Sequence, residues 1–599
     1  MTARVVFLFA SVTAFAQLPP AQAPPPRVIT ESRKAEPPAR TIARVDATVS
    51  DMKGNPITGL TAADFTLEVN GKQESIETCV YRADQPLRLA VIVDDLSLSA
   101  PHLDKARQAL GQFVAVRLRP GDEAAILRTS AGAGALDRLT PDHEALSAAI
   151  ARVTYNPASE SAADGAFTAG TLGALRAVVE GMRELPGRKA LLLISDRLRT
   201  PARENVAVTT RITTLAHQAS AVVFAVDMRD APEQPFMLEQ GLAAAARETG
   251  GVFVDGGDIA KILDRIAQQQ AGYYVLGYHA DGDFLTGAPR VSQVAVKAKD
   301  PDALVRARNG VFGATNSLDD QSYRNPEHEF ERAVGQELVS GDVRIKLTGL
   351  VTIGNSFVVD GLVHVDGRDL TFRKGLDGRY YSVLETAVAL YGEDGVSVKE
   401  VARTIEVMLG EESFRTLRAS GVDYTLSLAL TKPGCYQLRA LTRDAATGRM
   451  GSAREFMRAT NWSQGNLVMS SIVLRGESRK REDGAETPKN PDESTALRIF
   501  TAGRQLTYTY SLFNAAADAQ RRSTVEVKAQ IFRNGVLIHD GDAVTLAFNP
   551  AADPGRRAAT GVIKLGEQAA PGHYILRLRV TDKIAPHTAT QQMDFEVRP

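Results

Sequence analysis

A short run of polar residues after an apolar stretch has the composition of a metal site. Asp95, Ser97 and Ser99 stand at alternate positions directly after the apolar run 89–93. One carboxylate and two hydroxyls at this spacing place three hard oxygen atoms on one side of a tight loop. Mg²⁺ prefers such ligands because it is small, octahedral and oxygen-coordinated.

Two further residues could complete the site. Thr171 follows Gly170 just before a helical pattern, and Asp196 follows the apolar run 190–194. Ligands of open α/β sheets bind where the carboxyl ends of parallel strands meet. We therefore expect one Mg²⁺, with Mn²⁺ or Ca²⁺ as alternatives, at a site formed by Asp95, Ser97, Ser99, Thr171 and Asp196.

This set resembles the metal-ion-dependent adhesion site of the von Willebrand factor A (VWA) family, with its Asp-x-Ser-x-Ser motif, Gly-Thr loop and Asp after an apolar strand. Residues 42–312 are also similar to secreted bacterial VWA-related proteins, which carry a short β unit, here 49–70, and a Tyr-x-Leu-Gly-Tyr strand, here 274–278. The resemblance implies that the two serines and the threonine ligate the metal and that the two aspartates bind directly or through water. A carboxylate from a partner would fill the open position.

Two departures from the family pattern leave a second interpretation open. Leu98 stands where the family often has glycine, and Arg197 follows Asp196 where glycine is usual. The Arg197 cation could pair with that carboxylate and compete with the metal. Alternatively, the Asp-x-Ser-x-Ser residues only cap a helix that begins near Pro101, as Ser and Asp do at helix N-termini.

The segments that must position these residues have the sequence pattern of strands alternating with helices. Six apolar runs are expected to be strands, and helical spacing lies between them. This pattern predicts an α/β fold with a doubly wound, mainly parallel sheet of VWA or Rossmann type. The expected strands are 89–93, 124–127, 190–194, 221–226, 252–254 and 273–278.

The flanking sequence divides into further segments. Pro433–Arg439 and Pro571–Arg577 share a Pro-Gly turn followed by a Tyr-bearing strand, which indicates two related Ig-like β-sandwiches. The predicted limits are a signal peptide 1–16, a Pro-rich linker 17–41, an N-terminal β unit 42–84, a VWA-like domain 85–312, a linker 313–330 and sandwiches 331–460 and 461–599.

Composition and the N-terminal sequence limit the partners and the cellular location that we expect for this chain. Its 599 residues include 70 basic and 71 acidic side chains, so the chain lacks the excess of positive charge that is typical of nucleic-acid-binding proteins. Arg4, the apolar run 5–16 and its Ala-x-Ala end indicate export to the periplasm or the outside of a bacterium. No later run reaches the roughly 18 apolar residues of a transmembrane helix. Cys79 and Cys435 are expected to be separate thiols.

Three functions remain open from the sequence. The first is a secreted adhesion module that binds an acidic side chain of a protein ligand through the metal. The second is a metal-independent envelope scaffold that acts through its sandwiches. The third, an envelope enzyme, lacks a recognisable site, because no His-x-x-x-His pair and no Gly-x-Ser-x-Gly elbow occurs. We therefore expect no catalytic residues and no enzymatic activity.

Overall fold

The computed structural model describes most of the chain from residue 42 to residue 598. The predicted signal peptide, the Pro-rich linker, Arg197 and nearly all of the linker 313–330 lie outside the described residues. The described range excludes 53–54, 131–138, 157–166, 184, 186–187, 197–205, 230–240, 280–290, 308–309, 313–329, 331–340, 354–356, 393–395, 462–464, 477–493, 549–554 and 586.

One sheet is parallel throughout and has the strand order β6-β5-β7-β8-β9. Its strands are continuous apolar runs because both faces of the sheet are covered. The bounds are β5 Arg88–Val93, β6 Glu123–Arg128, β7 Lys189–Ser195, β8 Ala221–Asp227 and β9 Phe253–Asp255.

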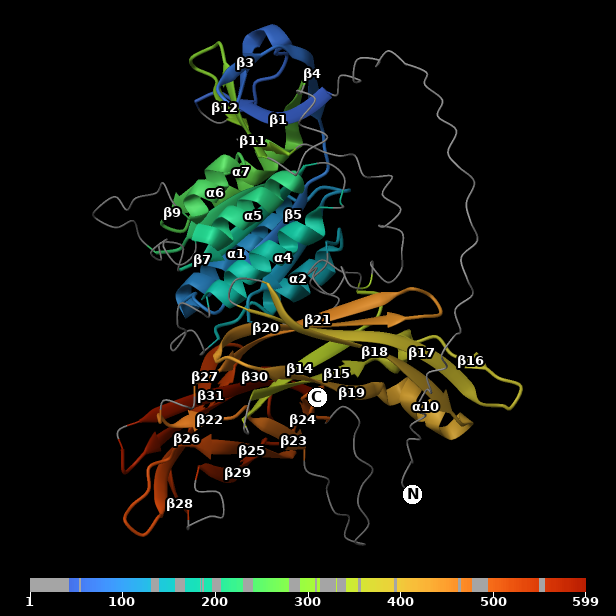
Figure 1. Ribbon diagram of the computed structural model, residues 1–599, viewed down its shortest axis with the longest axis vertical. Helices are drawn as coiled ribbons and strands as arrows, with labels where there is room; N and C mark the ends of the chain where they lie inside the picture. The colour runs from blue at the N-terminus through green and yellow to red at the C-terminus, as the bar shows by residue number, and fades with distance from the viewer. Residues whose placement is uncertain are drawn as a thin grey trace, which may run out of the picture. The chain divides into compact units, whose positions relative to one another are not determined.

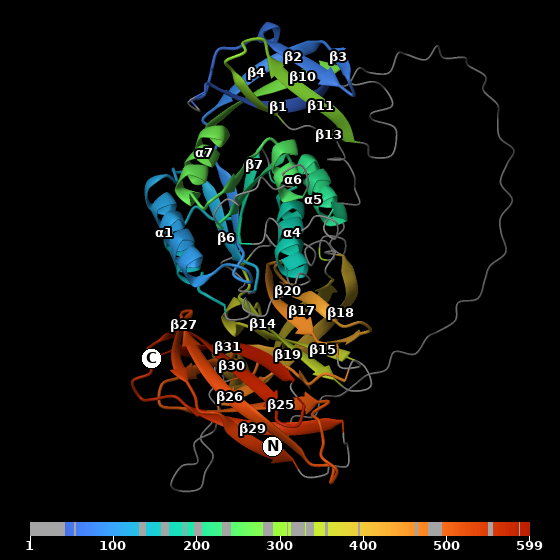
Figure 2. The same ribbon diagram turned by 90° about the vertical axis from the view of Figure 1, so that its left-hand side faces the viewer.

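Helices cover the two faces of this sheet, as Figure 2 shows. Alternate residues of β5 point to opposite faces, so Leu89 and Val91 pack in one core and Ala90 and Ile92 in the other. The first face packs against α1 Ala100–Val116, α2 His143–Ala151 and α7 Ile259–Ala271. The second carries α4 Gly173–Met182, α5 Val206–Gln218 and α6 Leu242–Glu248.

Strands from before and after this region pair with one another in two antiparallel sheets, with the orders β12-β1-β10-β4 and β13-β11-β2-β3. Their bounds are β1 Ile42–Ser50, β2 Phe65–Val69, β3 Lys72–Glu74, β4 Ile76–Ala83, β10 Gly272–His279, β11 Val291–Ala298, β12 Leu304–Ala307 and β13 Gly310–Phe312. A short 3-10 turn, η1 Ala62–Asp64, precedes β2.

The remaining strands form four more sheets, drawn from yellow-green to red in Figure 1. The first two sheets contain β14 Ile345–Ile353, β15 Phe357–Val365, β16 Arg373–Lys374, β17 Tyr380–Tyr391, β18 Ser397–Leu409, β19 Val422–Leu430, β20 Gly434–Asp444 and β21 Met450–Ala459. The other two contain β22 Val468–Met469, β23 Val473–Gly476, β24 Ile499–Thr501, β25 Gln505–Phe513, β26 Ser523–Arg533, β27 Val536–Asp540, β28 Val544–Phe548, β29 Arg556–Lys564, β30 Gly572–Asp582 and β31 Thr588–Arg598. Only η7 Gly367–Asp369 and α10 Glu411–Ser420 interrupt the strands in these described segments as named helices.

The fold class predicted from the sequence, a doubly wound and mainly parallel sheet of VWA or Rossmann type, is wrong for this chain. The described residues form seven separate sheets, and outside β6-β5-β7-β8-β9 only the pair β24–β31 is parallel. The run 273–278 lies in β10 and pairs antiparallel with β1 and β4 instead of extending the parallel sheet. An apolar run after a helix has the same sequence pattern in either sheet, so its pairing partners could not be inferred.

The repeated Tyr-bearing phrase has the same local structure in both places. The Tyr436 hydroxyl donates to the carbonyl of Lys432 at 2.9 Å, and the Tyr574 hydroxyl donates to the carbonyl of Ala570 at 2.7 Å. Each tyrosine thus fixes the turn four residues before it at the start of β20 or β30. No disulfide joins Cys79 and Cys435, as expected.

Among the described residues, no helix is long and apolar enough to cross a membrane. Residues Thr41–Pro599 form one compact unit.

Two buried tyrosines of β10 differ in their hydrogen bonding and provide a stability test. The Tyr274 hydroxyl donates to the Ile57 carbonyl and accepts from the Leu60 amide, both at 3.0 Å. Replacing Tyr274 with Phe leaves two backbone groups unpaired, and we expect a loss of about 1–3 kcal/mol. Differential scanning calorimetry measures the change in melting temperature.

The matched control is Tyr278→Phe on the same strand. The Tyr278 hydroxyl is buried and has no hydrogen-bond partner among the residues that the structure describes. Its removal should therefore leave the free energy of unfolding unchanged or raise it slightly. Equal destabilisation by the two substitutions would contradict this account of β10.

Candidate functional site

Asp94, the first residue after β5, lies at the centre of a buried polar cluster. Its Oδ2 accepts hydrogen bonds from the hydroxyls of Ser97 at 2.5 Å and Ser195 at 2.7 Å. Its Oδ1 accepts from the hydroxyl of Thr129 at 2.9 Å. These hydroxyls come from the ends of β5, β7 and β6, so three neighbouring strands meet at one fully buried carboxyl group.

Thr171 lies at the same cluster, on the π-helical turn η4 Phe167–Leu172. Its side chain is fully buried, and among the described residues its hydroxyl makes no hydrogen bond of full geometry, only a weak one with the Asp94 carboxyl group. The pKa of Asp94 is raised by burial, while hydrogen bonds from the hydroxyls of Ser97, Ser195, Thr171 and Thr129 oppose this rise. The buried Asp94 carboxyl group and the weakly bonded Thr171 hydroxyl therefore face one another.

Asp95 faces the loop after β6 and touches the cluster only at Thr129. Its Oδ1 accepts from the amide of Ser130 at 2.9 Å and lies 3.0 Å from the hydroxyl of Thr129. The Ser130 hydroxyl donates to Oδ2, and the Arg128 guanidinium lies 4.0 Å from it. The single Thr129 hydroxyl proton is shared between two buried carboxyl groups, because Asp94 and Asp95 both lie within hydrogen-bond distance of it.

Asp196 is bound at the N-terminus of α1. Its carboxylate contacts His102 Nδ1 at 2.7 and 2.9 Å and accepts from the backbone amide of Ser99 at 3.1 Å. Ser99 is the N-cap residue of α1, but its own side chain makes no capping hydrogen bond. Asp196 therefore supplies an acceptor for the free amides that begin this helix.

The five residues predicted to bind a metal do not converge on one point. Ser97 and Thr171 lie beside Asp94, whereas Asp95 and Asp196 are hydrogen-bonded to other groups. Sequence analysis missed Asp94 because the Asp-x-Ser-x-Ser pattern begins one residue later. It also missed Ser195 and Thr129. The indication that could have found all three is position, since each is the last residue of a parallel strand or the first after it.

The cluster around Asp94 has a donor set that suits a hard cation. In the described part of the chain, no three His, Cys, Asp or Glu side chains come together as a metal cluster. Any cation here would be bound by one carboxylate and by the hydroxyl oxygens of Ser97, Ser195 and Thr171. Mg²⁺ accepts such ligands and usually retains water molecules. The weakly bonded Thr171 hydroxyl and the buried Asp94 carboxyl group therefore fit a small divalent ion.

Strands β20 and β21 cover part of the carboxyl edge of the parallel sheet. The Phe456 amide donates to the Ser130 carbonyl at 3.3 Å, and the Arg454 guanidinium donates to the Arg128 carbonyl at 2.8 Å. A Cβ atom at Gly170 would lie 2.6 Å from Leu96 Cδ1. Only glycine fits there without displacing Leu96, which keeps the Thr171 turn close to the loop after β5.

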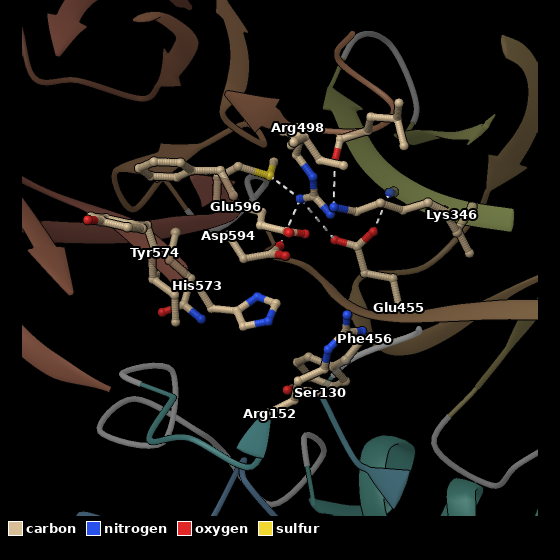
Figure 3. Close-up of a pocket in the computed structure, with 18 of the residues that line it drawn as sticks. Ser130, Arg152, Lys346, Glu455, Phe456, Arg498, His573, Tyr574, Asp594 and Glu596 are labelled. Carbon is tan, nitrogen blue, oxygen red and sulfur yellow. Dashed lines mark hydrogen bonds and ion pairs between the residues drawn. The ribbon is translucent and has the colours of Figure 1, made fainter. Parts of the chain in front are cut away.

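A cavity of about 640 Å³ lies beside this covered edge. One wall is lined by the end of β6 and the loops after β5, β6 and α2, and residues of the antiparallel strands line most of the rest. Figure 3 shows Ser130 and Arg152 on the first of these walls. On the far wall, Arg498 lies 2.9 Å from Asp594 and 3.8 Å from Glu455. Burial raises the pKa of Glu455 to about 7, and the Arg498 cation opposes this rise.

Two further basic groups of the cavity have lowered pKa values. Burial, together with the Arg498 charge, lowers the pKa of Lys346 to about 8. Burial, together with the charges of Arg152 and Arg128, lowers the pKa of His573 to about 4. His573 is therefore neutral at pH 7.

Comparisons with known proteins do not identify the chain. No family model and no curated protein matches it. Similar solved structures include a red sea bream transglutaminase, with 10% identity over 42% of this chain and 31% of that chain and a TM-score of 0.14. A Bacteroides uniformis β-glucuronidase gives 9% identity over 40% and 26%, with a TM-score of 0.15. A superoxide reductase from Ignicoccus hospitalis gives 9% over 23% and 100%, with a TM-score of 0.14. At these TM-scores the likenesses support no inference about fold or activity.

The lowered pKa of His573 predicts how stability depends on pH. Since the pKa falls from its usual 6.5 to about 4, the folded state binds fewer protons than the unfolded state between these values. The free energy of unfolding should therefore fall as the pH drops through this range. His573→Gln should make that fall smaller in thermal unfolding measured between pH 4 and pH 7, with exposed His143→Gln as the matched control. Parallel curves for wild type and His573→Gln would contradict the prediction.

Proposed function

We propose that the protein is an exported binding protein that captures an acidic group of a ligand through a divalent metal ion. Asp94, Ser97, Ser195 and Thr171 would hold the metal. The observation that carries this proposal is the buried Asp94 carboxyl group with hydroxyls from three strand ends around it and the buried, weakly bonded Thr171 hydroxyl beside it. The resemblance of the Asp-x-Ser-x-Ser stretch to adhesion sites supports the same chemistry.

The charge balance of the cluster favours an anionic ligand. Bound there, the ion would act as a Lewis acid with an open position for a carboxylate oxygen. Hydroxyl ligands are neutral, so Asp94 alone cannot neutralise a divalent charge. Asp95 is already bound by Ser130 and Arg128, and Asp196 by His102, so these carboxylates stay outside the proposed ligand set.

The covered edge limits the shape of the ligand. Because β21 contacts the end of β6 and the loop after it, part of this edge is covered, and Asp95, Leu96 and Ser130 beside the Asp94 cluster line the cavity. A cavity of about 640 Å³ admits an acidic side chain on an extended segment, whereas a flat protein surface would not reach it. We therefore propose a projecting acidic residue of a protein ligand as the captured group.

A metal-independent scaffold that acts through its antiparallel β-sandwich domains is the second candidate. The hydrogen bonds that already satisfy Asp95 and Asp196 favour it, because these carboxylates need no cation to be stable. The two candidates differ in whether Mg²⁺ binds the folded chain.

Calorimetric titration of the full chain with Mg²⁺ and Mn²⁺ tests the proposal. We expect one-site binding by the wild type and loss of binding in Asp94→Asn. Saturating metal should also raise the melting temperature, since a ligand at 100 times its Kd stabilises the folded state by about 2.7 kcal/mol. Asp104→Asn is the matched control, because Asp104 lies exposed on α1.

Thr171→Val is the sharper variant. The hydroxyl that it removes makes only a weak hydrogen bond with Asp94, so the metal-free protein should lose little stability while its metal affinity falls. Asp95→Asn should retain binding if Asp94 is the ligand and lose it if the register inferred from the sequence is right. No binding heat in the wild type would reject the metal proposal and leave the scaffold.

A further inference from the structure

Lys346 of β14 places an amine in the wall of the cavity. Its Nζ donates to the backbone carbonyl of Leu497 at 2.5 Å, and among the described residues no carboxylate lies at ion-pair distance from it. Two residues further along β14, the Thr348 hydroxyl donates to the Ala496 carbonyl at 2.9 Å. These neighbouring hydrogen bonds fix β14 against the segment before β24 and hold the amine in place.

The carbonyl that binds this amine directly precedes a cation. Figure 3 shows the Lys346 side chain reaching toward the Arg498 guanidinium, and Arg498 follows Leu497 in the chain. Asp594 and Glu455 lie 2.9 and 3.8 Å from Arg498, so the guanidinium engages both acids. Burial and the Arg498 charge disfavour a proton on the amine. A lysine that is desolvated beside another cation is activated as a nucleophile.

A histidine–aspartate pair continues from Lys346 across the sheet. Lys346 is opposite His364 in the register of β14 and β15, and His364 is opposite Asp423 in the register of β15 and β19. Residues directly opposite one another in antiparallel strands project from the same face, with Cβ atoms about 4.5–5.5 Å apart. His364 Nδ1 contacts Asp423 Oδ1 at 2.6 Å, and His364 also lines the cavity. The amine, the imidazole and the carboxylate therefore form one row.

Gly421 leaves space beside the second nitrogen of this ring. A Cβ atom at position 421 would lie 2.6 Å from His364 Nε2, and the φ of +75° is one that other residues rarely adopt. Because Nδ1 is engaged with Asp423, Nε2 is the ring nitrogen that remains for proton exchange with the cavity. Histidine is the side chain that most often transfers protons in protein sites. The row thus combines a nucleophilic amine with a proton carrier.

The cavity around this row has the size and polarity of a site for a small polar molecule. Its volume of about 640 Å³ lies within the range of about 300–1,000 Å³ that is usual for small-molecule sites. Thr154, Ser471 and Gln592 bring hydroxyl and amide groups to its wall. These groups can bind hydroxyl or carbonyl oxygens of a ligand.

We propose that Lys346 captures a small polar aldehyde in this cavity as a reversible imine. The neutral amine adds to the carbonyl carbon, and one proton passes from nitrogen to the former carbonyl oxygen. A second proton follows when the C–O bond breaks, so that one water molecule leaves as the C=N bond forms. His364 carries these protons. The step uses no metal ion and no residue of the Asp94 cluster, so it is independent of the function proposed above.

Reductive trapping of the full chain with glycolaldehyde and cyanoborohydride tests the proposal. The reductant converts an imine into a stable secondary amine, which peptide mass spectrometry locates and quantifies. At pH 7, an amine with a pKa of about 8 is unprotonated on the order of a hundred times more often than an ordinary lysine with a pKa of about 10.4. We expect Lys346 to be labelled at least about tenfold faster than Lys399, which is exposed on β18 and does not line the cavity.

Two substitutions separate the parts of the site. Lys346→Arg keeps a cation that can bind the Leu497 carbonyl but cannot form an imine, so its peptide should carry no label. His364→Gln should slow the labelling of Lys346 at least about tenfold, as the loss of a proton carrier implies, and leave that of Lys399 unchanged. His143→Gln, on the exposed side of α2, is its matched control and should change neither rate.

The labelling rates in the wild type decide the proposal without any variant. Equal rates at Lys346 and Lys399, or no label at Lys346, would overturn it. Fast labelling of Lys346 that His364→Gln leaves unchanged would overturn the part assigned to His364. Because the trapping is done with EDTA present, failure of the metal proposal would not alter any of these results.

Discussion

The burial of the Asp94 carboxyl group is the constraint on which the carboxyl edge of the parallel sheet depends. A carboxylate removed from water is unstable unless hydrogen bonds or a cation replace its hydration. Here Ser97, Thr129 and Ser195 supply hydroxyls, and they belong to the ends of three different strands. The strand ends therefore have to stay in register for the charge to be tolerated, which couples the electrostatics of the site to the packing of the sheet.

The strands that cover this edge also shape the space beside it. Phe456 and Arg454 bind the backbone after β6, and their contacts close one side of the space beside the Asp94 cluster. What remains is a cavity next to the hydroxyl cluster. Asp95 lines the cavity and lies 3.0 Å from the Thr129 hydroxyl, which also binds Asp94, so one shared threonine connects the cavity wall to the cluster.

Local sequence patterns predicted individual strands and turns but not which strands pair with one another. The apolar run 89–93 lies in β5, and the phrase at Tyr436 and Tyr574 has the same hydrogen bond twice. The run 273–278 was assigned to the wrong sheet, because the periodicity of a strand does not depend on the distant segment with which it pairs. Likewise, Asp95 matched the motif, but only three-dimensional contacts show that Asp94 faces the hydroxyls. The cavity is formed by segments hundreds of residues apart, so no local sequence pattern could predict it.

The pairing of β1 with β10 has a consequence for how the chain folds during synthesis. Tyr274 of β10 binds the carbonyl of Ile57, which stands 217 positions earlier. At about 5–20 residues per second, the ribosome makes the early segment on the order of 10–40 s before its partner exists. Throughout that interval β1 has an open edge with unpaired amides and carbonyls, the kind of edge that invites association with other chains. The order of translation, rather than final stability, therefore sets the period in which this protein is most prone to aggregate.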